Sequence, residues 1–341
     1  MRVAVCSPQV PFARGGAEIL AETLVAELQR RGHIADLVTL PYKWYPGARV
    51  LSQAFLWRLV DLEEADGLPI DLVIGTKFPS YAVRHRAKVA WLVHQFRQAY
   101  DYDRTGLGQF SESAEDRALR RAVHRFDRVA FGECRHVFTI SQNVADRLER
   151  HLGIAAESLP PPPQALDFRC ERYDDFVLSV NRLDRAKRID LLIEAAATDP
   201  GLRVVVAGDG PDRPRLERIA AEHGLNGRVS FAGRVSEEEL ARLYATCRAV
   251  FYAPVDEDYG MVPYEAFLSE KPVVTTLDAG GPLEVVADGA TGRVVAPEAA
   301  AIAGALAALD PETARRLGRA GRERASRITW DGCIDRLLAY A

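Results

Sequence analysis

Short runs of β-branched residues alternate with amphipathic helical segments along the whole chain, and this alternation restricts the fold more than any other feature. In the first half, strands are expected at residues 2–6, 34–39, 72–75, 88–93 and 136–140. In the second half, they are expected at residues 176–180, 203–207, 229–231, 249–252 and 273–276. Helical periodicity fills the gaps, for example at residues 17–31 and 112–132. Strands that alternate with helices predict parallel sheets covered on both faces, so the two sets predict an α/β protein with two doubly wound domains.

Four consecutive prolines at residues 160–163 separate the two sets of strands. Proline fits neither a helix interior nor a central strand, so the run predicts a semi-rigid extended linker between domains. The alternative is a proline-rich surface loop within one domain. A chain of 341 residues is long for a single core. We therefore expect a first domain over residues 1–163, a second over 164–326 and a terminal helix over 327–341.

The composition is that of an ordinary globular protein, with 48% hydrophobic residues, 27% charged residues and a net charge of -4. This charge gives no reason to expect nucleic acid as a partner. The five cysteines are scattered and form no C-x-x-C pair, which argues against disulfides and zinc and favours a reducing cytoplasm. No apolar run reaches the roughly 18 residues of a membrane-spanning helix.

Glu257 and Glu265 flank a turn that follows the apolar run at residues 249–252. Pro263 suits the first turn of a helix, and Gly260 permits a sharp approach to it. Glu257 is therefore expected in a loop at the carboxyl end of a strand, and Glu265 on the next helix. Ligands of open α/β folds bind at that place. The alternative is a solvated acidic loop followed by a helix-stabilising glutamate.

Two cations, Arg182 and Lys187, lie between the expected strand at residues 176–180 and the next helix. An arginine fork and a lysine point charge at the carboxyl end of a strand suit a diphosphate. The alternative is that the charged residues 184–188 form only a solvated turn.

Glycines open three further turns that follow expected strands. Gly15 and Gly16 precede a helix, where they allow close approach of a ligand and where the helix N-terminus favours phosphate. Gly208 opens the sequence GDGP, which we interpret mainly as a tight turn that could lie beside a ligand. Gly280 and Gly281 precede a short helix whose amides could meet a phosphate or a sugar. None of the three turns matches G-x-G-x-x-G, so a dinucleotide-binding fingerprint is absent.

Two further features have both a structural and a functional interpretation. His94 ends the apolar sequence WLVH at the carboxyl end of a strand, where it either contacts a ligand or serves the fold. The helix at residues 112–132 carries arginines at positions 117, 120, 121, 125 and 128. A solvated face is the default interpretation of these arginines, and a membrane-surface patch is the alternative.

Several of these sequences, taken in order, resemble the retaining glycosyltransferases of family 4, which have the GT-B fold. The resemblance covers nearly the whole chain and rests on GGAE, His94, TISQNVADRL, RLDRAK, AGDGP, FAGRVSEEEL, the two glutamates and GGPLEVVADGATG. It implies two Rossmann-like doubly wound domains that face each other across a cleft. The second domain would bind the nucleotide sugar and the first the acceptor, and the last helix would cross back onto the first domain. Two departures are Asn181, where the family usually has glycine, and the linker PPPPQALDF, which lacks the usual asparagine-glycine turn.

The resemblance also implies a role for each candidate residue. Glu265 would bind the ribose of the nucleotide, while Glu257 and His94 would contact the donor sugar. Arg182 and Lys187 would neutralise the diphosphate. The remaining binding positions implied are Gly15 and Gly16 in a loop closing on the diphosphate, Gly260 and Met261 in the sugar and phosphate cradle, Val235 beside the base, and Gly208.

The resulting expectation is an enzyme that transfers a hexose from a UDP- or GDP-sugar to a hydroxyl acceptor, which is a glycan, a lipid-linked sugar or a small molecule. Cations and helix N-termini stabilise a departing diphosphate strongly in a closed site, so neither a metal nor another cofactor is expected. The protein is expected in the cytoplasm, and a peripheral contact with the inner face of the membrane stays open.

Other classes of protein stay open at this point. A retaining glycosidase would use the two glutamates as acid and nucleophile, with carboxyl groups about 5–5.5 Å apart, but it would not need Arg182 or Lys187. A nucleotide-sugar epimerase would isomerise the donor without an acceptor. A binding module would be expected to lack part of the set Glu257, Glu265 and Arg182. An NAD oxidoreductase is disfavoured by the missing glycine fingerprint.

Overall fold

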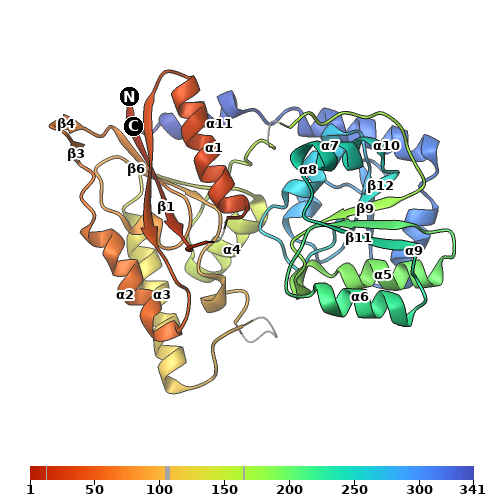
Figure 1. The fold of residues 1–341 in the computed structure, drawn as a ribbon. Helices are drawn as coiled ribbons and strands as arrows, with labels where there is room; N and C mark the ends of the chain where they lie inside the picture. The colour runs from red at the N-terminus through yellow and green to blue at the C-terminus, as the bar shows by residue number, and fades with distance from the viewer. Residues whose placement is uncertain (13, 104–107, 164–165) are drawn as a thin grey trace. The chain divides into compact units, whose positions relative to one another are not determined.

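The computed structural model describes residues 1–12, 14–103, 108–163 and 166–341, which form two compact units (Figure 1). The first unit contains Met1–Pro161 and Thr329–Ala341, and the second contains Pro162–Ile328. The expected start of the second domain, residue 164, lies outside the described residues, as does part of the linker PPPPQALDF.

The sheet of the first unit has parallel strands in the order β2-β1-β5-β6-β7-β8. The strands are β1 (Arg2–Gln9), β2 (Ile34–Pro41), β5 (Leu72–Gly75), β6 (Lys88–Leu92), β7 (His136–Thr139) and β8 (Glu157–Ser158). The helices are α1 (Gly16–Arg30), α2 (Val50–Leu56), α3 (Ala114–Gly132), α4 (Gln142–Leu152) and α11 (Trp330–Leu338). The strands expected in this half are confirmed. β8 and the hairpin of β3 (Glu64–Ala65) with β4 (Leu68–Pro69) were not predicted, because strands of two residues show no periodicity.

The last helix, α11, packs on the first unit. The Trp330 ring meets Trp91 of β6 edge-on, with the ring centroids 6.0 Å apart. The indole N–H of Trp91 donates to the carbonyl of Leu159 at 2.8 Å. At the solvent edge, Arg31 donates to the Asp335 carboxylate at 2.6 Å. The buried side chains of α11, among them Ile334 and Leu337, carry most of this attachment, since exposed ion pairs contribute little.

The sheet of the second unit has parallel strands in the order β11-β10-β9-β12-β13-β14. The strands are β9 (Val177–Val180), β10 (Val204–Ala207), β11 (Val229–Gly233), β12 (Ala249–Phe251), β13 (Val273–Thr276) and β14 (Gly292–Val295). The helices are α5 (Ile189–Thr198), α6 (Arg213–Glu222), α7 (Glu237–Thr246), α8 (Met261–Leu268), α9 (Ala299–Ala307) and α10 (Pro311–Ala325). The strands expected in this half are also confirmed, and β14 is an addition.

The inner strands of both sheets are buried because they are continuous apolar runs, as expected of parallel sheets covered by helices, whereas the edge strands β2 and β11 are partly exposed. In the second unit, Val206 and Phe251 pack in one core with Ile193 of α5 and Leu306 of α9, and all four are completely buried. Burial of each such side chain contributes about 1.5–3 kcal/mol. The α/β architecture with two doubly wound sheets is confirmed.

Each sheet has one place where the strand order reverses. In the second unit, β10 and β11 lie on one side of β9, and β12, β13 and β14 lie on the other. The loops that follow β9 and β12 therefore lie at this reversal point on the carboxyl edge of the sheet, where ligands of such folds bind. The corresponding place in the first unit lies between β1 and β5.

Candidate functional site

The loop between β9 and α5 carries both candidate cations of the second unit. It contains the 3-10 turn Arg185–Lys187, which Asp184 caps by accepting from the Ala186 amide at 3.1 Å. The Arg182 side chain is exposed and has no hydrogen bond or ion pair with any other described residue. A guanidinium without a partner at the carboxyl end of a strand is available to an anion.

Arg188 fastens this loop to the neighbouring strands. Its backbone is in the left-handed region, with φ of 49°, which is unfavourable for a side chain other than glycine. The guanidinium offsets this cost with bonds to both Asp278 carboxylate oxygens at 2.8 and 2.7 Å and to the Ala253 carbonyl at 2.9 Å. The charged residues of this loop are therefore more than a solvated turn.

Backbone hydrogen bonds hold Glu257 against the segment that follows β13. The Glu257 amide donates to the carbonyl of Ala279 at 2.8 Å, and the Gly281 amide donates to the carbonyl of Glu257 at 2.8 Å. A Cβ on Gly281 would lie 2.7 Å from the carbonyl oxygen of Asp258, so this close packing requires glycine. The Gly281 amide therefore positions Glu257, while the expected contact of the other amides at this turn with a phosphate or a sugar stays a prediction.

The two loops meet in an ion pair between Lys187 and Glu257. The Tyr252 hydroxyl donates to the same Glu257 oxygen at 3.2 Å, and the Lys187 ammonium lies 5.7 Å from the centre of the Tyr252 ring. Burial opposes the charge of Lys187, but Tyr252 and Glu257 outweigh it and raise the pKa of the ammonium above its ordinary value. Lys187 therefore stays cationic at neutral pH at the carboxyl ends of β9 and β12.

Glu265 lies on α8 and is almost fully buried, with 8% of its surface exposed. The hydroxyl of Tyr244, on α7, donates to its Oε2 at 2.7 Å and is the carboxylate's one partner among the described residues. Burial raises the pKa of Glu265, and the bond from Tyr244 only partly opposes this. The Oε1 atom thus keeps hydrogen-bonding capacity that the fold does not use.

Helix α8 begins where the sequence predicted, directly after the Glu257 loop. Gly260 is its N-cap, with φ of 82°, and Pro263 lies in its first turn. A Cβ on Gly260 would lie 2.8 Å from the Tyr252 ring, so glycine satisfies both the dihedral angle and the packing. The first amides of a helix, including that of Met261, have no partner within the helix and favour an anion.

Gly208 and its neighbours pack against the loop that carries Arg182. Gly208 has φ of 129°, and a Cβ on it would lie 1.8 Å from the carbonyl oxygen of Asn181. Its amide donates to the Gly233 carbonyl at 2.7 Å. Val235 follows Gly233 at the carboxyl end of β11 and is half-buried. Gly208 therefore serves close packing between the loops. This agrees with the interpretation of the sequence GDGP as a tight turn.

The candidate residues of the first unit lie at the carboxyl ends of β1 and β6. Gly15 is the N-cap of α1 and Gly16 its first residue. A Cβ on Gly16 would meet no atom within 4 Å, so nothing in this unit requires glycine there. His94 lies just beyond β6, with its Nδ1 2.7 Å from the Gln95 carbonyl oxygen.

A second lysine–glutamate pair lies where the strand order of the first unit reverses. Lys77, which follows β5, pairs with Oε1 of Glu18 on α1. Oε2 of Glu18 accepts from the Gly15 amide at 2.9 Å. Both side chains are about nine-tenths buried, at 10% and 11% exposure. The pair closes the N-terminus of α1 onto the sheet.

The sequence interpretation missed Tyr252, Tyr244 and Arg188. Tyr252 and Tyr244 stand among apolar residues of a strand end and a helix, and therefore look like ordinary core residues. Arg188 stands in a charged turn. Only their partners show their roles, and those partners come from other elements.

Two negative results concern the described residues alone. Among them, no group of three or more histidine, cysteine, aspartate or glutamate side chains could hold a metal ion. Nor does that part of the chain contain a helix of the length and apolarity needed to cross a membrane.

Each of the two units matches a different protein family. Residues 171–324 match the family of glycosyl transferases group 1, and residues 14–161 match glycosyltransferase family 4. The two parallel-sheet units and their solved neighbours define the GT-B fold. Each unit therefore contains a domain of a glycosyltransferase family, and the two matches together cover most of the chain.

Solved structures support the fold at low sequence identity. Sucrose-phosphate synthase from Thermosynechococcus elongatus superposes with a TM-score of 0.77 over 100% of both chains at 20% identity. Anabaena HepE in complex with UDP and glucose gives 0.70 over 99% of this chain and 98% of the other, at 17% identity.

Curated relatives resemble part of the chain more closely. The D-inositol 3-phosphate glycosyltransferase of Mycolicibacterium paratuberculosis is 36% identical over 176 residues, which are 48% of this chain and 39% of the relative. The alpha-1,3/1,6-mannosyltransferase ALG2 of Dictyostelium discoideum is 31% identical over 179 residues, 45% of this chain and 42% of the relative. The matches thus span about two fifths of each relative. These names are those of transferases and do not favour the glycosidase, epimerase or binding-module alternatives.

Proposed function

We propose that this protein is a retaining glycosyltransferase that moves a hexose from a nucleotide diphosphate sugar to a hydroxyl acceptor without a metal ion. The observation that carries the proposal is the chemistry of the side chains at the reversal point of the second sheet. There, Arg182, which has no partner among the described residues, and the cationic Lys187 share the carboxyl edge of the sheet with Glu257. A glycosidase needs no such cations, whereas a departing diphosphate does.

In the proposed complex, Arg182 and Lys187 neutralise the diphosphate, and the α8 amides at Gly260 and Met261 add positive partial charge. Glu257, already held by its backbone and by Lys187, accepts hydrogen bonds from hydroxyls of the donor sugar. The charge of Lys187 thus serves both its carboxylate neighbour and the phosphate.

Glu265 binds the ribose of the nucleotide in this proposal. Its buried carboxylate has capacity left on Oε1, and a charged acceptor makes strong bonds to hydroxyl donors. Val235 flanks the base, and Gly208 keeps the loops close enough to form this side of the site. HepE, which shares the fold, forms a complex with UDP and glucose, and we propose a UDP- or GDP-sugar as the donor here.

The first unit supplies the acceptor side. His94 contacts the sugar, and the loop at Gly15 and Gly16 closes on the diphosphate. The absence of any neighbouring atom around a Cβ at Gly16 supports this role, because the unit's own packing does not call for glycine there. A cytoplasmic location is part of the proposal, since all five cysteines are free thiols.

The proposed reaction needs no protein nucleophile. The bond between the sugar's anomeric carbon and the diphosphate oxygen breaks, and a bond to the acceptor oxygen forms on the same face. The acceptor's proton passes to the departing phosphate. Arg182 and Lys187 stabilise the charge that grows on that phosphate, which is the contribution expected to matter most for rate.

A panel of nucleotides and nucleotide sugars tests the proposal, with binding followed by calorimetry and turnover followed by release of the nucleoside diphosphate. We expect one nucleotide to bind, and full transfer activity in EDTA. Isomerised donor without acceptor would indicate an epimerase. Cleavage of a nitrophenyl glycoside without nucleotide would indicate a glycosidase, and a strict need for manganese would contradict the metal-free reaction.

A further inference from the structure

A cluster of exposed apolar side chains lies on the first unit, where α2 and the 3-10 turn Trp57–Leu59 meet α3. Phe55, Leu56 and Leu59 are 55%, 49% and 80% exposed, and Val129 of α3 is 57% exposed. Helices α2 and α3 lie side by side (Figure 1), and the Phe55 ring contacts Phe126 of α3 with the ring centroids 5.4 Å apart. Isolated exposed leucines are common, but contiguous apolar groups mark an interaction surface.

Three arginines of α3 stand beside this cluster. Arg121, Arg125 and Arg128 are spaced by four and three residues, so they lie along one face of the helix. All three are exposed, and none has a hydrogen bond or an ion pair with another described residue. Val129 is adjacent to Arg128 in sequence and one turn from Arg125, which makes the basic stripe continuous with the apolar cluster. We call these seven residues, Phe55, Leu56, Leu59, Arg121, Arg125, Arg128 and Val129, the α2–α3 face.

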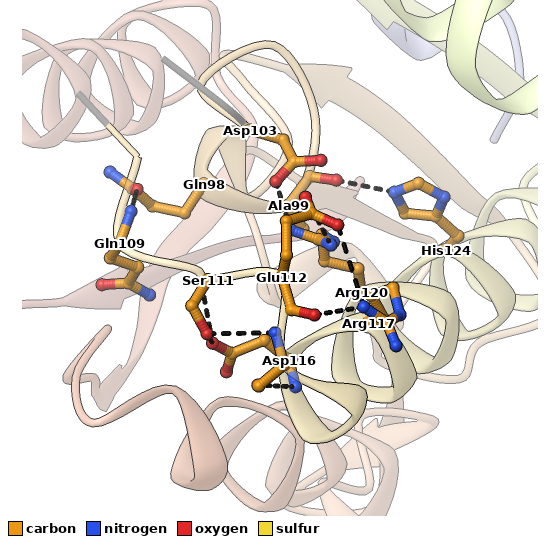
Figure 2. A network of polar contacts seen from close by, with 11 residues as sticks. Gln98, Ala99, Asp103, Gln109, Ser111, Glu112, Asp116, Arg117, Arg120 and His124 are labelled. Carbon is orange, nitrogen blue, oxygen red and sulfur yellow. Dashed lines mark hydrogen bonds and ion pairs between the residues drawn. The ribbon is translucent and has the colours of Figure 1, made fainter. Parts of the chain in front are cut away.

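Most of the acidic residues near α3 have other partners or are buried. Figure 2 shows the network at the start of the helix, in which Asp116 accepts from the Ser111 hydroxyl at 2.6 Å and Glu112 lies 3.5 Å from Arg120. Asp127 points into the core and is completely buried. At the other end, Glu133 accepts two bonds from Arg58, at 2.5 and 2.7 Å. Among the described residues of α3, Glu115 is the one exposed carboxylate without a partner, so the three arginines outnumber the acidic charge along the helix.

We infer that the α2–α3 face docks on an anionic lipid bilayer. The inference is independent of the proposed glycosyl transfer. Exposed phenylalanine and leucine side chains beside arginines are the combination that lies in a membrane interface, with the apolar groups among the acyl chains and the cations among the headgroups. Nucleic acid would use the arginines but would leave four apolar side chains in water. The net charge of the chain is -4, so attraction to anionic lipid must come from a local surface such as this one.

Vesicle co-sedimentation of the full chain tests the inference, with phosphatidylcholine vesicles compared with a mixture of phosphatidylcholine and phosphatidylglycerol. We expect binding to the mixed vesicles that weakens as salt is added. Replacement of Arg121, Arg125 and Arg128 by glutamine should weaken binding by roughly fivefold for each arginine. The variant Leu56→Ser/Leu59→Ser, which leaves the Phe55 contact in place, should weaken it by roughly tenfold or more.

The matched control replaces three exposed arginines of the second unit, Arg218, Arg316 and Arg319, by glutamine, which changes the net charge equally. This control should bind vesicles as the unmodified chain does, and circular dichroism should show all variants folded. Equal loss in the control would overturn the inference, as would absence of vesicle binding. A stable dimer that the Leu56→Ser/Leu59→Ser variant abolishes, or binding to DNA in place of vesicles, would also overturn it.

Discussion

Each of the two units buries one carboxylate beneath tyrosine hydroxyls, but the two carboxylates are satisfied to different extents. In the first unit, Asp127 accepts from Tyr81 at 2.8 Å and from Tyr100 at 2.6 Å, one bond to each oxygen. In the second, Glu265 accepts from Tyr244 alone among the described residues. Asp127 is 0% exposed, whereas 8% of Glu265 is exposed.

The cations show the same difference. In the first unit, Lys77 pairs with Glu18, and the other oxygen of Glu18 binds the Gly15 amide, so the carboxylate is used up within the fold. In the second unit, Lys187 pairs with Glu257, but Arg182 beside it has no partner in the described chain. A polar cluster that fills its own hydrogen-bonding capacity serves stability, and one with capacity left over can serve a ligand.

The sharpest test of this difference is removal of each lysine in turn. Lys187→Ala should lower kcat by about a hundredfold to a thousandfold, because it removes a cation that stabilises the departing diphosphate. Lys77→Ala should leave kcat within a small factor of the original value. Steady-state kinetics of both variants measures the two effects. An equal loss of kcat in both would contradict the assignment of the Lys187–Glu257 pair to the site and of the Lys77–Glu18 pair to stability.

Glu265→Ala should weaken nucleotide affinity by about a hundredfold, because a buried charged acceptor of ribose hydroxyls is lost. Calorimetric titration with the nucleotide measures this effect. Asp127→Asn, the matched change in the first unit, should leave the affinity unchanged.

Glu257→Ala should spare nucleotide affinity more than turnover, since Glu257 faces the sugar in the proposed complex. Unchanged transfer rates in both glutamate variants would contradict the assignment of the site.

Lys77→Ala should instead lower the free energy of unfolding of the first unit by about 2 kcal/mol, because it leaves Glu18 largely buried without its cation. All four tryptophans of the chain belong to the first unit, so tryptophan fluorescence in a urea titration reports that unit alone. An unchanged urea midpoint would show that the Lys77–Glu18 pair contributes nothing to stability.

The smallest expected effect concerns pH. Burial raises the pKa of Asp127 to about 7 in the folded state, against an ordinary value of about 4. The folded state therefore binds the proton more tightly, and the free energy of unfolding falls as pH rises between these two values. From about pH 5 to about pH 6, Asp127 should account for a loss of about 1 kcal/mol. The same fluorescence titration should show a flatter pH dependence in Asp127→Asn, and an identical dependence in both proteins would refute the role of this carboxylate.

Much of the fold and part of the candidate site could be predicted from the sequence. The β-branched runs predicted the main strands of both sheets, because strand and helix periodicities are local properties of the chain. The same local signals placed Glu257 in a loop, Glu265 on the following helix and Gly260 at the helix start. Two-residue strands such as β8 carry no such signal and were missed.

The sequence by itself determined which elements form, that the sheets are parallel, and that acidic and basic residues stand at the ends of strands. Only the tertiary structure decided that Lys187 meets Glu257, 70 residues away, and that Tyr244 fills one oxygen of Glu265 and leaves the other open. It also showed that the Gly281 amide donates to the Glu257 carbonyl and so joins two loops. The physical reason is that these contacts depend on strand order and on the anchoring of loops, which join residues distant in the chain and leave no local pattern.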